Sequence, residues 1–348
     1  MSSSDAAPPA GLSDWLAAGL ELGSVRLVPI LRGRNNAVFR AEGVGRRVAV
    51  KVYPPAQAGP CDRLDHEWRA LSFLAAQGVA AVPRPLLREP RRRWAAYSWL
   101  DGAPPDAAMA ARAVAEGWLV DFLARLHGLR HHPEAAALPP AAESGLVPLA
   151  PRARLAGRLG ALRDCRPPDD CWAASLGAFL DRVEAVLAPR LDQAEARISQ
   201  LGFDPQAPLP AHLSTLSPSD VGLHNMLVGA EGAPRFLDFE YFGRDDPVKL
   251  VSDTLLHPGS AFQPAQRARL KADLIALYGA DDATFAARLE ALMPLYVGLW
   301  CLILLNEFRP EAWRRRLAAG LDPADHQALL GRQLARAERY LRDLEVAG

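Results

Sequence analysis

The pattern of hydrophobic and polar positions changes character near residue 102. Before it, short runs rich in apolar residues are separated by Gly-containing turns, a pattern typical of strands. One amphipathic helix is expected at 62–77, where Leu64, Trp68, Leu71 and Leu74 recur at helical spacing. A short helix is expected at 12–22, after a tail. The expected strands, which would form one five-stranded antiparallel sheet, are 25–30, 37–42, 47–53, 82–87 and 94–100.

After residue 102 helical patterns dominate, with Pro-rich connectors at 130–150 and 202–211. Two short strands, 226–228 and 236–239, are expected within them, joined by a turn. The sequence therefore predicts an α+β protein with a tail and short helix (1–22), a small sheet domain (23–102) and a helical domain (103–348). The expected helices are 107–129, 154–163, 172–200, 245–256, 264–278, 281–292, 295–307, 309–319 and 323–345.

Composition adds few constraints. Formal charge is zero over 348 residues, so nothing global indicates a nucleic-acid or membrane partner. The apolar run 291–305 contains Pro294 and Gly298 and is short for a bilayer, so we expect a buried helix. The four cysteines show no metal-binding spacing. Residues 2–10 lack a basic region followed by an apolar run, so we do not expect a signal peptide there. We therefore expect reduced thiols and a cytoplasmic protein, either a monomer or a homodimer.

Three polar residues in the stretch 217–240 draw attention: Asp220, Asn225 and Asp238. The first two would lie on a loop before the strand 226–228, and Asp238 would end the strand 236–239. Two or three oxygen ligands for Mg²⁺ could gather there, with one more carboxylate facing a nucleophile. A solvated loop and hairpin is the competing interpretation, since Asp and Asn are ordinary turn residues.

Lys51 lies between apolar residues of the expected strand 47–53. The chain has only three lysines against 37 arginines, so a lysine here suggests a need for a compact ammonium that can bridge phosphate oxygens. Glu67, on the helix expected behind this strand, could pair with Lys51. The competing interpretations are an edge lysine and a solvated Glu. The turn 31–36 contains Gly33 and could direct amide N–H groups at a phosphate, or could be a plain hairpin turn.

Several motifs, in order, resemble those of the aminoglycoside phosphotransferase and choline kinase group of small-molecule kinases. Val48-Ala-Val-Lys51 resembles the V-A-I-K strand of protein kinases. Asp220 and Asn225 have the spacing of the family's H-G-D-x-x-x-x-N, and Leu237-Asp-Phe-Glu-Tyr241 and Asp245-Asp-Pro247 are similar to its next two motifs. Gly33 to Arg40 is similar to its phosphate loop, with Asn36 on the family's Asn. The chain departs from the pattern at Pro218-Ser219, where the family has His-Gly.

The resemblance implies a bilobal protein kinase-like fold that binds ATP and Mg²⁺. Lys51, held by Glu67, would touch the α- and β-phosphates, and Gly33 and Asn36 would belong to the phosphate loop. Asn225 and Asp238 would hold Mg²⁺. Asp220 would orient, or deprotonate, the acceptor hydroxyl. Adenine would lie against the connector formed by Trp99, Leu100 and Asp101.

The expected activity is phosphorylation of a hydroxyl on a small molecule, such as an amino sugar or an amino alcohol. An aromatic and acidic pocket would suit a cationic acceptor, although Tyr296 and Trp300 also have the spacing of core residues. A pseudokinase, which binds ATP without transferring it, is the alternative, and Pro218-Ser219 favours it. The candidate acceptor residues are Tyr241, Tyr296, Trp300, Asn306 and Glu307.

Overall fold

The structure is a computed structural model that describes residues 8–30, 36–55, 62–318 and 322–346. Its contacts divide the chain into two compact units. The first combines Met1–Ala142, Leu216–Arg244 and Gly259–Phe262, and the second combines Glu143–Thr215, Asp245–Pro258 and Gln263–Gly348. These units group residues by contact, which is a different criterion from the functional domains expected above, so those domain limits stay predictions.

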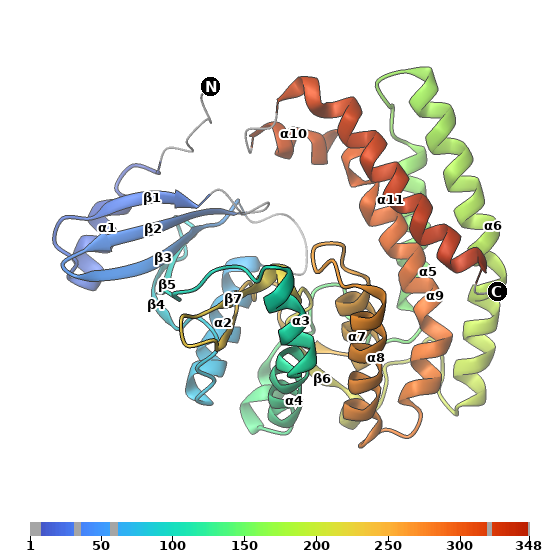
Figure 1. Cartoon of the computed structure of the whole chain (residues 1–348), viewed down its shortest axis with the longest axis horizontal. Helices are drawn as coiled ribbons and strands as arrows, with labels where there is room; N and C mark the ends of the chain where they lie inside the picture. Colours follow the sequence, from blue (N-terminus) through green and yellow to red (C-terminus); the bar gives the residue numbers. More distant parts are fainter. Residues whose placement is uncertain (1–7, 31–35, 56–61, 319–321, 347–348) are drawn as a thin grey trace. The chain divides into compact units, whose positions relative to one another are not determined.

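The predicted five-stranded antiparallel sheet is confirmed in the first unit (Figure 1). Its order is β1-β2-β3-β5-β4, and every neighbouring pair is antiparallel. Lys51 in β3 lies opposite Val38 of β2 and Ala95 of β5, which places it in the middle of the sheet. The strands are β1 (Arg26–Ile30), β2 (Ala37–Gly43), β3 (Arg46–Val52), β4 (Pro85–Glu89) and β5 (Trp94–Ser98).

Two helices accompany the sheet, as predicted. Helix α1 (Leu12–Leu20) contributes the fully buried Leu12 and Leu16 to one cluster with sheet residues such as Phe39 and Val50. Helix α2 (Arg63–Ala76) begins at an Asp62 N-cap, whose carboxylate accepts from the Asp65 amide. This cap fixes where the helix starts, and therefore where Glu67 lies along it.

The helix predicted over 107–129 is wrong in one respect, because it is two helices. Helix α3 (Ala107–Ala115) and helix α4 (Trp118–Leu129) are separated at Gly117, which has φ 74°. A left-handed residue cannot continue a right-handed helix, and glycine adopts that conformation without a Cβ clash. A short 3₁₀ helix, η1 (Pro133–Ala137), follows α4.

The segment 216–244 returns to the first unit through short elements. Strand β7 (Met226–Val228) pairs antiparallel with β8 (Pro234–Phe236), and Phe236 stacks on Phe122 of α4 at 3.9 Å between ring centroids. The strand predicted over 236–239 ends earlier, at Phe236. The sequence reading also missed two three-residue strands that pair with each other, β6 (Thr215–Ser217) and β9 (Gly243–Asp245).

The second unit is helical, and α9 is its central helix, in contact with α5, α6, α7, α8 and α11. The helices predicted at 281–292 and 295–307 are one helix, α9, with Pro294 inside it. Leu292 and Leu295 on either side of the proline are fully buried, and this packing outweighs the missing hydrogen bond. The helices are α5 (Ala150–Arg163), α6 (Asp170–Gln200), α7 (Pro247–Leu256), α8 (Pro264–Gly279), α9 (Phe285–Leu304), α10 (Pro310–Ala318) and α11 (His326–Val346).

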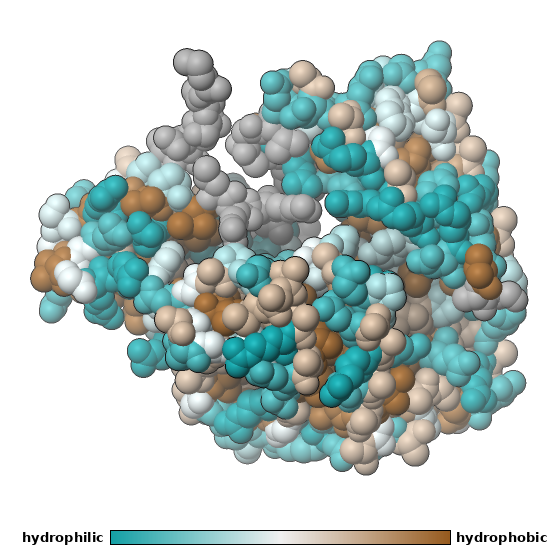
Figure 2. Space-filling view, viewed as in Figure 1, coloured by the Kyte–Doolittle hydropathy of each residue, from teal (hydrophilic) through white to brown (hydrophobic). Residues whose placement is uncertain are grey.

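Helix α9 is a buried helix of this unit, although its sequence is apolar enough for a membrane span. By length and composition Phe285–Phe308 could cross a membrane, but 56% of its apolar window is buried inside the protein. Helix α11 buries Leu330, Ala337 and Leu341 on one side, and hydrophilic residues predominate over this part of the unit on the face drawn in Figure 2. The prediction of a buried helix around residues 291–305 is confirmed.

A buried charge network holds α7 against α9. Asp246 caps α7 through the Val248 amide, and its other oxygen accepts from Arg288 at 2.7 Å. Arg288 is fully buried and also donates to Asp282 at 2.7 Å. Two carboxylates on one guanidinium satisfy a charge that burial would otherwise make costly.

Candidate functional site: a lysine and carboxylate cluster

The predicted pair of Lys51 and Glu67 is present in the first unit. Lys51 Nζ donates to both carboxylate oxygens of Glu67, at 2.7 and 2.9 Å, and to Asp238 Oδ1 at 3.0 Å. Burial opposes the charge on Lys51, but Asp238 and Glu67 hold the pKa of its ammonium well above the ordinary value. One ammonium from the sheet is thereby fixed against two carboxylates from distant parts of the chain.

Two tyrosines that the sequence reading missed support Glu67. Tyr53 donates its hydroxyl to Glu67 Oε2 at 2.5 Å and lies 2.8 Å from the Tyr97 hydroxyl. Burial, and next the charge of Glu67, raise the pKa of Tyr53, so its hydroxyl stays a donor. Lys51 and Tyr53 are two residues apart on one strand and therefore face the same side. This two-residue spacing could have indicated from the sequence that Tyr53 lies beside Lys51.

Asp238 occupies a left-handed backbone conformation, which is uncommon among non-glycine residues. Its φ is 67°, in the left-handed region that costs a non-glycine residue about 1–2 kcal/mol. The neighbouring backbone holds it there, since the Leu237 amide donates to the Asn225 carbonyl at 2.9 Å and the Phe239 amide lies 3.4 Å from Glu67 Oε1. Strained residues of this kind concentrate at functional sites.

The loop that carries Asp220 is tied down by its own side chains. Asn225 Nδ2 donates to the Asp220 carbonyl at 2.9 Å, within the turn that ends in the 3₁₀ helix η3 (Leu223–Asn225). Ser219, where the family has Gly, has φ 64° and donates its hydroxyl to the Tyr241 carbonyl at 3.1 Å. Asp220 keeps 34% of its side chain exposed. The substituted Pro218-Ser219 thus forms an ordered turn that leaves the carboxylate accessible.

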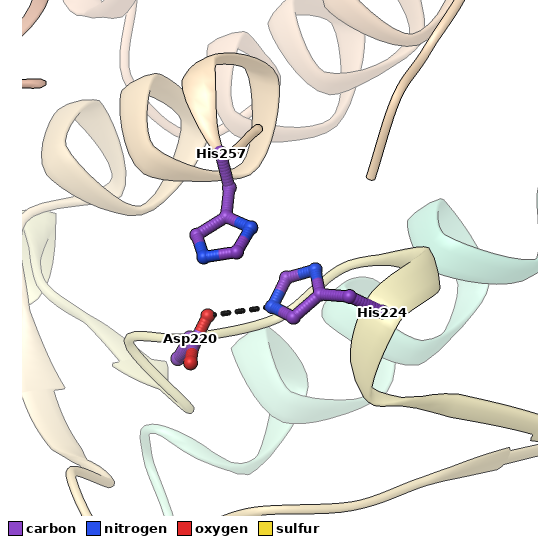
Figure 3. Close-up of side chains that lie close together, drawn as sticks. All are labelled: Asp220, His224 and His257. Atoms are coloured by element: carbon purple, nitrogen blue, oxygen red, sulfur yellow. Dashed lines mark hydrogen bonds and ion pairs between the residues drawn. The ribbon is translucent and has the colours of Figure 1, made fainter. Parts of the chain in front are cut away.

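The importance of His224 was also missed from the sequence. Its Nε2 lies 2.7 Å from Asp220 Oδ1, with the bond drawn in Figure 3. The partner is the candidate catalytic carboxylate. His257, also drawn in Figure 3, belongs to the second unit.

Glu240, two residues after Asp238, contacts Asn36 and Arg63 from the front part of the chain. It is fully buried, accepts from Asn36 Nδ2 at 2.5 Å and lies 3.6 Å from the Arg63 guanidinium. Asn36 is the last residue of the turn predicted to hold phosphate, and this bond joins Asn36 to the segment that carries Asp238. Gly33, the other residue predicted for this turn, lies outside the described residues.

The predicted adenine connector forms a cluster of its own. Trp99 Nε1 donates to Asp101 Oδ1 at 3.0 Å, and Asp101 also pairs with Arg47 at 3.0 Å. The Arg40 guanidinium lies 5.7 Å from the Trp99 ring centroid. Leu100, between Trp99 and Asp101 in the sequence, is partly buried. The roles of Trp99, Leu100 and Asp101 in nucleotide binding stay predictions.

The candidate acceptor residues are distributed over both units. Tyr241 lies in the first, with the Arg63 guanidinium 5.3 Å from its ring centroid. In the second unit, Tyr296 and Trp300 are 2% and 9% exposed, which fits the competing interpretation of core residues. Glu307 pairs with Arg316, so its charge is already balanced. Asn306 begins the 3₁₀ helix η4 (Asn306–Phe308). Their role in acceptor binding stays a prediction.

The donor set of the first unit fits a divalent cation. The carboxylates of Glu67, Asp238 and Glu240 offer oxygens within 4.8 Å of one another. Three negative charges face the positive charges of Lys51 and Arg63, which leaves an excess of negative charge. Carboxylate and amide oxygens are the ligands that Mg²⁺ prefers, and the Asn225 bond through Nδ2 leaves its amide oxygen available as an acceptor.

The chain is similar to known proteins in sequence and in fold. A sequence model described as the phosphotransferase enzyme family matches residues 26–290. No curated protein sequence matches the chain significantly. Among solved structures, a choline kinase from Streptococcus pneumoniae is similar with 15% identity and a TM-score of 0.56, over 95% of this chain and 98% of its own.

Two phosphotransferases are similar as well. Spectinomycin phosphotransferase, solved with ADP and spectinomycin, shows 13% identity and a TM-score of 0.59, over 94% of this chain and 99% of its own. A macrolide 2′-phosphotransferase from Brachybacterium faecium shows 23% identity and a TM-score of 0.50, over 90% and 99%. These likenesses confirm the predicted protein kinase-like fold. Since the family match covers most of the residues, the chain belongs to the phosphotransferase enzyme family.

Proposed function

We propose that the protein transfers the γ-phosphoryl group of ATP to a hydroxyl of a small molecule, with Mg²⁺ as the cofactor. The observation that carries this proposal is the contact of Lys51 with both Glu67 and Asp238. A partly buried ammonium on a strand, fixed by one carboxylate beside a second one, is the arrangement that phosphoryl transfer in kinase-like enzymes requires.

Lys51 would bind phosphate oxygens as a point charge, with Glu67 preventing it from swinging away. Asp238 and Asn225 would hold Mg²⁺, which supplies electrostatic stabilisation of the negative charge on the transferring group. The bond from Leu237 to Asn225 keeps these two ligand positions on adjacent backbone. Asn36 would lie beside the phosphates, and Trp99 to Asp101 would flank the base.

Asp220 would accept the hydroxyl proton of the acceptor, or hold that hydroxyl in line with the γ-phosphorus. Its exposed carboxylate and its fixed loop suit this role. General base catalysis of this kind contributes roughly 10²–10⁴-fold in rate. Most of the remaining acceleration would come from positioning and electrostatics.

The acceptor is proposed to be small because the similar structures include a choline kinase and a spectinomycin phosphotransferase. Both names describe hydroxyl-bearing compounds that contain nitrogen, so amino alcohols and amino sugars are the first acceptors to test. A cytoplasmic location, where ATP is abundant, is part of the same proposal.

The test is ADP release from Mg-ATP with choline, ethanolamine, spectinomycin, a macrolide and thiamine, together with ³¹P NMR for a new phosphomonoester. Wild type is expected to turn over with at least one acceptor, and Asp220→Asn is expected to lose roughly 10²-fold or more of that rate. Asp121→Asn, an exposed carboxylate on α4, is the matched control and is expected to retain full activity.

Two other results would count against the proposal. Nucleotide binding without turnover for any acceptor would favour a pseudokinase, to which the substituted Pro218-Ser219 would then be relevant. Equal ADP release by wild type and Asp220→Asn would remove Asp220 from the mechanism.

A further inference from the structure

The loop that carries Asp220 contains a hydrogen-bonded chain of three side chains. Asp220 Oδ1 lies 2.7 Å from His224 Nε2, and His224 Nδ1 lies 3.2 Å from Ser260 Oγ. All three residues belong to the first unit, although Ser260 is 36 positions further along the sequence. Figure 3 shows the His224 ring directed at the Asp220 carboxylate.

The chemistry of the partners sets the direction of these bonds. An ionised carboxylate only accepts, so His224 must carry its proton on Nε2 and donate it to Asp220. In the neutral ring Nδ1 is then the acceptor, and the Ser260 hydroxyl is the donor that satisfies it. The carboxylate therefore sets the Nε2–H tautomer, and the Ser260 hydroxyl, which can donate as well as accept, stabilises it by donating to Nδ1.

The sequence keeps space for this arrangement at Gly222. A Cβ at that position would lie 2.2 Å from Ser260 Oγ and 2.9 Å from both Cε1 and Nδ1 of His224. The φ of Gly222 is 168°, an extended conformation open to any residue. Glycine is required here by the close approach of Ser260 and His224, which is an observation independent of the two hydrogen bonds.

Exposure decides which end of the chain can react. The side chain of Asp220 is 34% exposed and that of His224 is 17% exposed, whereas Ser260 is 3% exposed. A Ser-His-Asp hydrolase needs an accessible serine nucleophile, so a buried Ser260 excludes that use of the triad. The accessible group is the carboxylate, and the buried hydroxyl supports it.

We propose that His224 is a positioning residue that fixes the Asp220 carboxylate through Oδ1, with Ser260 fixing His224. This inference rests on the proposed function. The other carboxylate oxygen, Oδ2, then takes the proton of the acceptor hydroxyl while the hydroxyl oxygen forms a bond to the γ-phosphorus. The bond from the γ-phosphorus to the β,γ-bridging oxygen breaks, and ADP leaves with its electron pair.

The kinetic test compares His224→Leu, which removes the donor, with His224→Gln, whose amide can donate to Asp220. His224→Leu is expected to lower kcat roughly 10- to 100-fold, because a misplaced base loses its alignment. KM for Mg-ATP is expected to stay within about twofold of the wild-type value, since the change does not alter ground-state binding of the nucleotide. His224→Gln is expected to recover most of kcat, and the exposed His131→Leu is the matched control with full activity.

A spectroscopic test needs no acceptor. In protein labelled with ¹⁵N-histidine, two-bond ¹H–¹⁵N spectra at pH 8 report the tautomer of each ring, and the His224 signal is the one absent from His224→Gln. Wild type is expected to show the Nε2–H tautomer at His224. Ser260→Ala and Gly222→Ala are expected to weaken that preference and to lower kcat in the same direction as His224→Leu.

The outcomes separate this inference from the proposed function. An Nδ1–H tautomer at His224, or a His224→Leu enzyme with the kcat of wild type, would overturn the positioning role. A His224→Gln enzyme as slow as His224→Leu would overturn it as well. If wild type releases no ADP with any acceptor, the proposed function fails, and the tautomer measurement alone decides the role of His224.

Discussion

Replacement of Glu67 by Gln removes one charge from the cluster while it preserves the volume of the side chain. Glu67 is 2% exposed. Its Oε1 contacts Lys51 and lies near the Phe239 amide, and its Oε2 contacts Lys51 and Tyr53. Both oxygens therefore accept from donors. In either orientation the amide NH₂ of Gln would face a donor, and the ammonium of Lys51 would lose half of its counter-charge.

The size of the effect follows from the contacts that remain. Removal of one partner from a buried ion pair costs about 3–5 kcal/mol, and a hydrogen bond to a charged group is worth about 1.5–3 kcal/mol. Lys51 keeps Asp238 at 3.0 Å, which offsets part of the loss. We therefore expect Glu67→Gln to lower the free energy of unfolding by about 2–4 kcal/mol.

The measurement is urea denaturation followed by circular dichroism, with a calorimetric titration of Mg-ATP on the same samples. The affinity for Mg-ATP is expected to fall about tenfold, since Lys51 is no longer held in place. Glu116→Gln is the matched control, because Glu116 forms an exposed pair with Arg112 that contributes little. Stability and affinity equal to those of wild type in Glu67→Gln would refute this account of the cluster.

Three further predictions test other parts of the fold. Burial tends to raise the pKa of Asp62, but hydrogen bonds from Arg93 and a backbone amide lower it overall, so the contribution of Asp62 to stability is present above about pH 4 and is lost as the pH falls through the folded-state pKa. Asp62→Asn should therefore flatten the loss of stability in acid, and an unchanged acid profile would contradict this. Ser219→Gly should keep the free energy of unfolding within about 0.5 kcal/mol of wild type, because relief of the left-handed strain offsets the lost hydrogen bond. Ser219→Ala keeps the strain and should lower the free energy of unfolding by about 1 kcal/mol; equal effects of the two changes would contradict this. Gly117→Ala should lower the free energy of unfolding by about 1–2 kcal/mol, because Gly117 has a φ of 74°. Gly128→Ala, inside α4 with open space around it, should be neutral or stabilising, and urea denaturation of the two variants tests the difference.

Much of the first unit could be predicted because its signals are local. Short apolar runs bounded by turns identified the strands, and helical spacing identified α2. The pairing of Lys51 with Glu67 followed from one helix expected behind one strand, and the structure confirms it. The contact of Lys51 with Asp238 could be proposed only through the family resemblance, since 187 residues separate the two.

Other features had no local signal, or a misleading one. Gly117 lies within an apolar periodic stretch, where a glycine is often tolerated, so the helix appeared continuous. Pro294 usually ends a helix, but burial of its neighbours in α9 overrides that preference. The three-residue strands β6 and β9 are too short to show a period.

Side-chain partnerships beyond the motifs were the hardest to foresee. His224 has an ordinary loop sequence around it, and its partner Ser260 lies in a distant segment. Tyr53 follows Lys51 by two positions, and strand alternation alone could have assigned it to the same face. Such contacts depend on how segments pack, which the sequence pattern does not specify.

The most direct test of the central claim is a calorimetric titration of ATP, with and without Mg²⁺, into wild type, Lys51→Met and Asp238→Asn. Lys271→Met, an exposed lysine of α8, serves as the matched control. If Lys51 and Asp238 form one triphosphate site, wild type and the control bind ATP in a Mg²⁺-dependent manner, and each site variant loses about tenfold or more in affinity. Equal affinity in all four proteins, or no binding by wild type, would contradict the account.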